Sequence, residues 1–452
     1  MPRDEFKSFE TLADFTFDLA FEDIPDLVVA YVAELLLDLI GVSAAATATE
    51  AGRIVREIAV SQFASGPDGE AARILFDGRK ASLVGAAYAG AAQIDNFDGH
   101  DGYAPNKGHI GVALLPALVT WAEAHKGVSG QEALLNLVQG YEIASRAGAA
   151  LHATVADYHT SGAWNALAVA AMGARLRGLS RDQLRQAIGI AEYHGPRSQM
   201  MREIDNPSML HDGSGWGAMA GMSAALLAER GFMGAPAITV EAEDVAHYWA
   251  DLGSYWYTFE QYIKPYPTCR WAHAPIDGAL LLKHQHNLTA DNVAAIEIKT
   301  FHESFRLSGD MPETTSKAQY SLAFPVAAAI VRGCVGPDEV LGSGLSDPEI
   351  ERLVGVTTVT EDDLYNERFP EGRWGDIALV LRDGRRLQSD AINARGGPDA
   401  RFSREDTVEK FHAFADSAIG KARAGQIVEA VFSLHKADAT LDGLSNLILN
   451  KH

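Results

Sequence analysis

The chain has 452 residues, of which 47% are hydrophobic and 22% charged, a composition typical of globular proteins that excludes disorder for most of its length. With 60 acidic and 38 basic residues, the formal net charge is −22. This balance disfavours nucleic acid or an acidic membrane surface as a partner. The only two cysteines, Cys269 and Cys334, exclude a disulfide scaffold and match no metal-ligand spacing.

The N-terminal residues are charged and lack the apolar run of a signal peptide. The longest apolar stretch, residues 27–39, is interrupted by Glu34 and Asp38. We therefore expect no membrane span and a cytoplasmic protein.

The first 260 residues show the pattern of successive helices. Acidic residues ahead of Pro25 predict a helix start, and residues 27–42 are apolar nearly all round, which predicts a buried helix. Capping boxes at residues 129–132 and 180–183 predict two further helix starts. The abundant Ala and Gly predict close helix packing, so we expect a compact helical bundle.

The pattern changes at Lys264-Pro265-Tyr266-Pro267, where two prolines predict a chain reversal or a domain crossing. Beyond it the sequence predicts a helix over 316–332, a hairpin turn at 383–384, helices from 403 onward, and strands over 295–301, 356–359 and 377–381. We expect a mainly α protein with an α+β second domain. The predicted boundaries are a helical domain from residues 1–265 and 403–452, and an α+β lid domain from residues 266–402.

The segment from Asp95 to His109 places carboxylates, two histidines and Lys107 between apolar helices. A solvated loop would explain its carboxylates, whereas a glycine-rich loop with acids and bases on a rigid scaffold is common at functional sites. A metal-dependent hydrolase using Asp95, Asp98, His100 and His109 is a third interpretation, although the spacing matches no strong metal motif.

A second segment, residues 156–162, places His159 just before a predicted helix N-terminus, where backbone amides favour an anion. Thr160 or Ser161 is explained by an N-cap alone. A local hydrogen bond is the plain alternative for His159.

A third segment contains Arg197 and Arg202, which could bind carboxylates bidentately or lie on the surface, followed by His211. A fourth, residues 269–273, contains Cys269 and His273. Core packing by a tryptophan and an interdomain salt bridge by an arginine would explain this segment equally well. No P-loop, dinucleotide fingerprint or nucleophile elbow is present, so the sequence indicates no nucleotide cofactor.

Taken in order, these segments resemble the MmgE/PrpD family, which includes 2-methylcitrate dehydratases, cis-aconitate decarboxylases and an iminodisuccinate epimerase. The resemblance covers about residues 28–434. The residues that carry it are 95–98, Gly108-His109 followed by 114–117, and His159 ahead of a predicted helix that ends at 174–179. Residues 217–221, and residues 264–267 together with His273, complete the pattern.

The resemblance implies a helical domain made from both chain ends, an α+β lid, a homodimer and a cleft between the domains. It also implies catalysis without a metal or an organic cofactor. By position, Asp95, His109 and His159 would line the helical side of the pocket, and Cys269 and His273 the lid side.

The chain departs from the family pattern at three positions. Where many members have a pocket lysine it offers His211, or Ser208 under a shifted alignment. Where the decarboxylases have a lid histidine it has Cys269, and near their lid tyrosine it has Tyr320 and Phe324.

We therefore expect a cofactor-independent lyase of the hydro-lyase type, which removes a proton next to a carboxylate of a small di- or tricarboxylic acid. An epimerase or decarboxylase of a similar acid is the alternative, and a catalytically inactive, dimeric carboxylate-binding protein belongs to another class. His109 and His159 are the predicted proton-transfer pair, and Asp95 would orient one of them. The predicted carboxylate-binding and charge-stabilising residues are Lys107, Arg197, Arg202 and His211.

Overall fold

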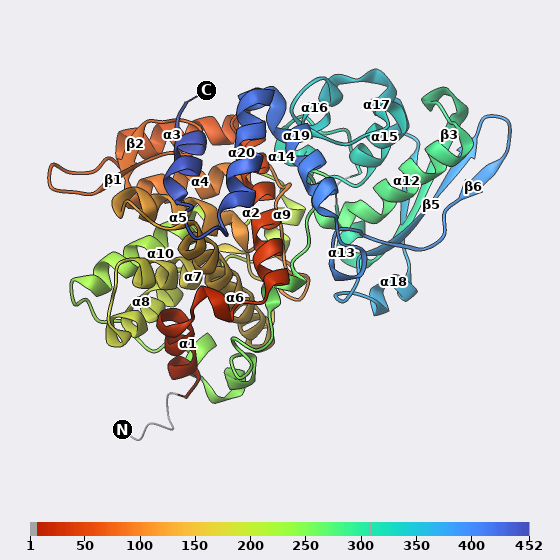
Figure 1. Cartoon of the computed structure of the whole chain (residues 1–452). Coiled ribbons are helices and arrows are strands. Elements are labelled where there is room, and N and C mark those ends of the chain that lie inside the picture. The colour runs from red at the N-terminus through yellow and green to blue at the C-terminus, as the bar shows by residue number, and fades with distance from the viewer. Residues whose placement is uncertain (1–6, 308, 452) are drawn as a thin grey trace.

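The computed structural model describes residues 7–307 and 309–451 and has two parts, a helical domain and an α+β lid (Figure 1). This is the architecture that the sequence predicted. The elements of the first part of the helical domain are α1 Lys7–Asp18, α2 Asp26–Ala46, α3 Glu50–Gln62, β1 Ala71–Arg73, β2 Lys80–Ser82, α4 Leu83–Asp95, α5 Gly111–Ala124, α6 Gly130–Thr154, α7 Gly162–Leu176, α8 Arg181–His194, α9 Met200–Asp205, α10 Ser214–Glu229 and α11 Ile238–Glu241.

Local sequence signals fix several helix starts. Ser180 and Gln183 form the predicted capping box of α8, and the Ser129 side chain accepts a hydrogen bond at the start of α6. The short β1–β2 hairpin was not predicted, because each of its strands has only three residues.

Helix α2 lies in the core of the helical domain. It is long and apolar enough to cross a membrane by length and composition, but 83% of its most apolar window is buried inside the fold. That burial explains its hydrophobicity as packing against neighbouring helices.

The lid contains a five-stranded sheet of order β4-β3-β5-β6, in which β7 also pairs with β5. The β3–β4 pair is parallel and the other pairs are antiparallel. Helix α12 packs on β5, where Gly278 allows close approach because a Cβ there would lie 2.6 Å from Ile377 Cγ2. The lid elements are α12 His273–His286, β3 Val293–Thr300, α13 His302–Phe305, α14 Thr315–Gln319, α15 Ala323–Arg332, α16 Pro337–Leu341, α17 Pro348–Val354, β4 Thr357–Glu361, α18 Asp363–Glu367, β5 Trp374–Leu381, β6 Arg386–Gln388 and β7 Ile392–Asn393.

The helix predicted over 316–332 is two helices, α14 and α15, separated by residues 320–322. Tyr320 leaves helical geometry at the C-cap of α14, and its hydroxyl lies 3.5 Å from Nδ1 of His211 in the helical domain. The helix thus breaks at Tyr320, the residue that contacts the other domain, and the local sequence pattern did not indicate this break.

The chain returns to the helical domain after the lid, through α19 Arg404–Ile419, α20 Lys421–Ser433 and α21 Leu441–Leu449. Helix α19 packs along α2, and Lys410 of α19 forms a buried ion pair with Asp38 of α2. In Figure 1 these blue helices lie beside the red and orange ones. The exact domain boundaries stay a prediction.

Candidate active site

The loop between α4 and α5 is buried, which removes the solvated-loop interpretation of its charged residues. Asp98, His100, Asp101 and His109 are each 5% exposed or less. Asp98 and Lys107 have positive φ values of 34° and 54°. Non-glycine residues held in this region are strained, and such strain is concentrated at functional sites.

The imidazole of His109 is held in one tautomer. Its Nδ1 lies 2.6 Å from the backbone oxygen of Asp101, and because a carbonyl only accepts, Nδ1 is the protonated nitrogen. Burial lowers the pKa of His109, although Asp212 and Asp98 act in the opposite direction. The neutral ring therefore presents an unprotonated Nε2, as a general base requires.

Nε2 of His109 faces two carboxylates, with Asp98 Oδ1 at 3.5 Å and Asp212 Oδ2 at 3.4 Å. His100 packs edge-on against His109 with ring centroids 4.2 Å apart, and its Nε2 lies 3.8 Å from Asp95 Oδ1. We call Asp95, Asp98, His100, His109 and Asp212 the histidine–carboxylate cluster.

Two helix N-termini hold the carboxylates of this cluster. Asp212 accepts hydrogen bonds from the backbone N–H and the hydroxyl of Ser161, before α7. Asp95 accepts from the N–H and hydroxyl of Ser214, at the start of α10. The positive ends of the helix dipoles favour anions at both places. Burial, together with Asp212, nevertheless raises the pKa of Asp95 well above its usual value.

Ser161 was predicted as no more than a helix cap. Its position before α7 fits that prediction, but its side chain makes no capping hydrogen bond to α7. Instead its hydroxyl donates to Asp212 at 2.6 Å and accepts from the backbone N–H of His109 at 2.8 Å. Ser161 thus connects the loop of His109 to the segment of Asp212.

Lys264 brings a buried ammonium group to the cluster from the crossing between the domains. Its Nζ pairs with the carboxylate of Asp98 and donates to the Asp98 backbone oxygen at 3.0 Å. Burial lowers the pKa of Lys264, but Asp98 and other anionic neighbours outweigh it, so the pKa lies above its usual value. In the sequence, Lys264 belongs to a predicted proline turn, and it was not among the predicted site residues.

His211 lies beside the cluster in a left-handed backbone conformation, with φ of 45°. Its Nδ1 is 3.8 Å from Glu203 Oε1. Burial lowers the pKa of His211 to about 4, and burial with Asp212 raises the pKa of Glu203 well above normal. On the lid side, burial raises the pKa of the Cys269 thiol to about 12, so this group is neutral and not a nucleophile.

Sequence comparison identifies the family of the chain. The MmgE/PrpD N-terminal domain family matches residues 10–249, and the MmgE/PrpD C-terminal domain family matches residues 266–434. The chain belongs to the MmgE/PrpD family.

Three relatives illustrate the range of this family. A cis-aconitate decarboxylase of Aspergillus terreus is 22% identical over 467 residues, covering 93% of this chain and 91% of the relative. The cis-aconitate decarboxylase-like protein oryM of Aspergillus oryzae is 24% identical over 78% of this chain and 79% of its own length. A mitochondrial 2-methylcitrate dehydratase of Yarrowia lipolytica is 24% identical over 61% of this chain and 57% of its own length. These relatives support a lyase- or dehydratase-type enzyme of small carboxylic acids.

His159, the predicted partner of His109 in this MmgE/PrpD site, is half-buried. Its backbone N–H donates to Nε2 of His152 at 3.0 Å, and its ring centroid is 6.5 Å from that of His152. Among the described residues, the ring in contact with His109 is His100, and no contact joins the His109 and His159 rings. Their pairing in catalysis stays a prediction.

Of the other predicted site residues, the two arginines lie apart from the cluster. Arg197 and Arg202 are exposed, and Arg197 lies 3.7 Å from Glu192. His273 is fully buried, with Nε2 3.1 Å from the Thr268 carbonyl and its ring edge-on to Tyr266. These contacts give Arg197 and His273 a structural explanation, and the roles predicted for all three residues stay predictions. Lys264 brings one ammonium group to the cluster, beside the carboxylates of Asp95, Asp98, Asp212 and the neighbouring Glu203.

Three side chains could together hold a metal ion. One ligand atom each from Asp98, His100 and His109 lies within 4.8 Å of the others. However, the ammonium group of Lys264 already pairs with Asp98, and its charge opposes a second cation there. The donor set therefore fits a metal poorly while Lys264 is in place.

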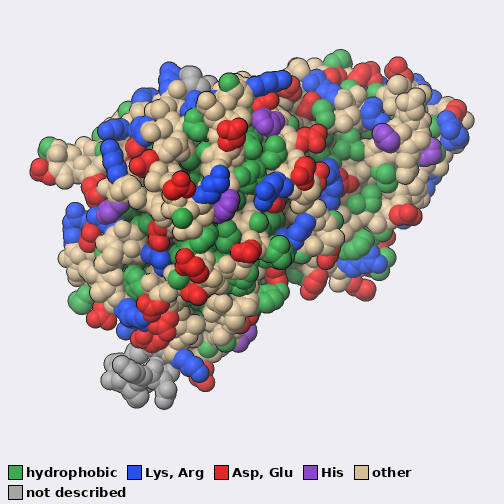
Figure 2. Space-filling view, viewed as in Figure 1, with side chains coloured by type: hydrophobic (Ala, Val, Ile, Leu, Met, Phe, Trp, Pro, Cys, Tyr) green, Lys and Arg blue, Asp and Glu red, His purple; other side chains and the backbone are tan. Residues whose placement is uncertain are grey.

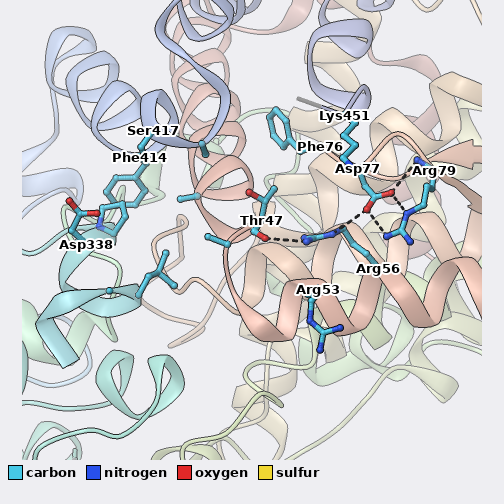
Figure 3. A pocket seen from close by; sticks show the side chains of 16 residues that line it. Thr47, Arg53, Arg56, Phe76, Asp77, Arg79, Asp338, Phe414, Ser417 and Lys451 are labelled. Carbon is cyan, nitrogen blue, oxygen red and sulfur yellow. Dashed lines mark hydrogen bonds and ion pairs between the residues drawn. The ribbon is translucent and has the colours of Figure 1, made fainter. Parts of the chain in front are cut away.

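A cavity of about 560 Å³ lies elsewhere, where α3, α16 and α19 meet (Figure 3). Its arginines are already paired: Arg56 and Arg79 with Asp77, and Arg53 with two glutamates outside the lining. On the face in Figure 2, acidic and basic side chains are likewise interspersed. Neither feature adds a group to the histidine–carboxylate cluster.

Proposed function

We propose that this chain is a lyase of the hydro-lyase type, which acts on a small di- or tricarboxylic acid. The observation that carries the proposal is His109, whose Nδ1–H is fixed on a backbone carbonyl, so that Nε2, beside the carboxylates of Asp98 and Asp212, is the nitrogen that accepts a proton. Relatives named as a dehydratase and as decarboxylases support the same class of substrate.

In the proposed reaction, Nε2 of His109 takes the proton from the carbon next to a substrate carboxylate. The electron pair of that C–H bond forms the new double bond, and a hydroxyl on the adjacent carbon leaves as water with a proton from a second acid. Lys264 stabilises the negative charge that develops on the substrate. His159 is the proposed second acid, supported by its place before α7, two residues from Ser161.

Reprotonation of the same intermediate on its other face would give epimerisation, and loss of a carboxylate would give decarboxylation. The resemblance implies a histidine in the decarboxylases at the position of Cys269, whose neutral thiol is a poor proton donor. This supports dehydration over decarboxylation. Incubating the protein with hydroxy- and amino-polycarboxylates distinguishes the outcomes by alkene absorbance, carbon dioxide release and optical rotation. Alkene formation without carbon dioxide is expected, and carbon dioxide release would contradict the hydro-lyase assignment.

Substitution tests the role of His159. His159→Ala should lower kcat by roughly 10²–10⁴-fold if its imidazole is the general acid. Near-normal kcat in the folded variant would remove His159 from the mechanism. Gln199→Ala is a matched control, because Gln199 pairs with His159 through the backbone and its side chain contacts Asp157 at the surface.

The proposed enzyme is a homodimer, as the family resemblance implies. Leu210 and Trp216 are 77% and 54% exposed, which is unusual for large apolar side chains unless a partner covers them. Both lie close in sequence to His211, so a second copy there would also shield the site. Light scattering should give twice the chain mass, and Leu210→Glu should shift it towards the monomer; a monomeric wild type would contradict dimerisation.

A further inference from the structure

The lid contains a buried arginine, Arg373, on which Glu303 acts only through its charge. Arg373 is 3% exposed; its Nη1 donates to the Pro370 carbonyl and its Nη2 to the Ala104 carbonyl at 3.1 Å, while its Nε has no hydrogen-bond partner. The guanidinium carbon lies 4.8 Å from the Phe369 ring centroid. Within residues 7–307 and 309–451, no carboxylate forms an ion pair with it. A buried cation without a counter-ion is costly, so it indicates a missing anion.

Lys107 is a second cation beside Arg373, contributed by the helical domain. The same Ala104 carbonyl accepts the Lys107 backbone N–H at 3.1 Å and Nη2 of Arg373. Lys107 Nζ lies 4.4 Å from the Tyr158 ring centroid, and its one oxygen contact in the described chain is the Pro105 carbonyl at 3.5 Å. Burial, and then the charge of Arg373, lower the pKa of Lys107, while Glu303 and Glu371 act in the opposite direction. Two like charges thus act on each other, and neither forms an ion pair with a described carboxylate.

These two cations border the proposed active site. Lys107 precedes His109 by two residues, and its strained backbone conformation fixes the turn that leads to it. Of the groups that could be anionic, Tyr262 and Cys269 have the strongest electrostatic interaction with Arg373. Both also interact electrostatically with Asp98 of the cluster. Arg373 therefore lies on the lid, against the loop that carries Lys107 and His109.

We infer that Arg373 and Lys107 form the subsite that binds a carboxylate of the substrate, at a position that leaves the adjacent carbon at His109. This inference rests on the proposed function and adds the residues that select a carboxylic acid. A guanidinium group binds a carboxylate through parallel N–H donors, and its free Nε–H and one Nη form such a fork. A carboxylate between the two cations also relieves their repulsion.

The subsite explains how an acidic chain binds an acidic substrate. The cluster contains more carboxylates than cations and would repel a substrate carboxylate. The positive charges of Arg373 and Lys107 bind that carboxylate instead. Because one cation belongs to the lid and the other to the helical domain, bound carboxylate joins the two domains.

Calorimetric titration with citrate and cis-aconitate, at low and at physiological salt, tests the subsite. Wild type should bind at least one of the two. Arg373→Gln should bind it roughly 10- to 150-fold more weakly, the loss expected for removing charge-assisted hydrogen bonds. Lys107→Gln should weaken binding by a smaller factor, and Arg373→Lys should recover part of the loss because it restores charge without the planar fork.

Arg368→Gln is the matched control, because Arg368 is a neighbouring lid arginine that stacks on Trp374, with 4.6 Å to the ring centroid. It should change the dissociation constant by less than about twofold. If Arg373→Gln does not fold, as judged by circular dichroism, Lys107→Gln and Arg373→Lys decide the result. Absence of binding by wild type, or wild-type affinity in Lys107→Gln together with any folded Arg373 variant, would overturn the subsite.

His109→Asn separates this inference from the proposed function. It should lose turnover and bind citrate or cis-aconitate as wild type does. Arg373-dependent binding by a wild type without turnover would reject the proposed function and keep the subsite. Turnover with an unchanged KM in Arg373→Gln would reject the subsite and keep the function.

Discussion

The two sides of the candidate site carry different chemistry. The helical domain contributes imidazoles and carboxylates that backbone amides and carbonyls hold in fixed positions, as for His109 and Asp212. The domain crossing and the lid contribute an ammonium, a guanidinium and a neutral thiol, at Lys264, Arg373 and Cys269. Proton transfer thus belongs to the helical side, whereas charge compensation comes from the domain crossing and the lid together with Lys107, so the proposed reaction needs both domains.

Removing the ammonium group should show how strongly the two sides depend on each other. Lys264→Met leaves the buried Asp98 carboxylate without its partner and should cost about 3–5 kcal/mol of unfolding free energy. Urea unfolding measures this cost. Lys410→Met is the matched control: it breaks the buried pair with Asp38 at similar cost, but should lower kcat of the folded protein less than Lys264→Met does, because Lys410 contacts only the backbone of the site loop, at Gly99. Equal losses of kcat in the two variants would contradict a catalytic role for Lys264.

A pH titration of stability examines the helical side alone. Burial raises the pKa of Asp101 to about 7, although hydrogen bonds from Tyr141 and Gly111 oppose the shift. Because the folded-state pKa lies above the unfolded one, the folded protein binds the extra proton. The Asp101 contribution to stability is therefore complete below about pH 4 and falls as pH rises to about 7, by about 1.4 kcal/mol per pH unit.

Asp101→Asn removes this titration. The unfolding free energy of the variant relative to wild type should therefore rise with that slope between about pH 4 and pH 7, and level off above it. Urea unfolding at intervals of half a pH unit measures the difference. A constant difference across this range would show that Asp101 does not titrate there.

A small effect is expected from the surface contact between the domains. Arg306 of the lid pairs with both oxygens of Asp205 in α9, and both side chains are partly exposed. Solvent screening limits such a pair to about 1 kcal/mol or less. Arg306→Gln should therefore lower stability slightly and raise KM less than Arg373→Gln does. A larger effect than that of Arg373→Gln would place the main lid contact at the surface.

No effect is expected from chelation. If the Lys264 ammonium occupies the place of a cation at Asp98, dialysis against EDTA should leave turnover unchanged. Loss of activity that zinc or manganese restores would instead support a metal at Asp98, His100 and His109.

Local patterns predicted much of the fold, because capping boxes, apolar runs and strand alternation act over a few residues. The α8 cap, the β3 and β5 strands and the mainly α architecture with its α+β lid are examples. For the site, the loop of Asp95 and His109 was found from its unusual mix of acids and bases between apolar helices.

What the sequence did not reveal depends on distant contacts. Lys264 meets Asp98 across 166 positions, and Arg373 meets Ala104 across 269. The residues next to Lys264 and Arg373 in the sequence do not distinguish a buried cation from one on the surface. Arg197 and Arg202 were predicted from a Gly-Pro turn, and their exposure could not be read from the sequence; their role in binding stays a prediction. A useful signal was the proline pair beside Lys264, which marked the place where the domains join.

The central claim is that His109 removes a proton next to a carboxylate, and isotope exchange tests it most directly. Wild type in deuterated water with a panel of hydroxy- and amino-polycarboxylates should replace that proton by deuterium in at least one acid, as followed by NMR. His109→Asn should exchange it roughly 10²–10⁴-fold more slowly. Exchange at the wild-type rate in the folded variant, or none across the panel in wild type, would contradict the account.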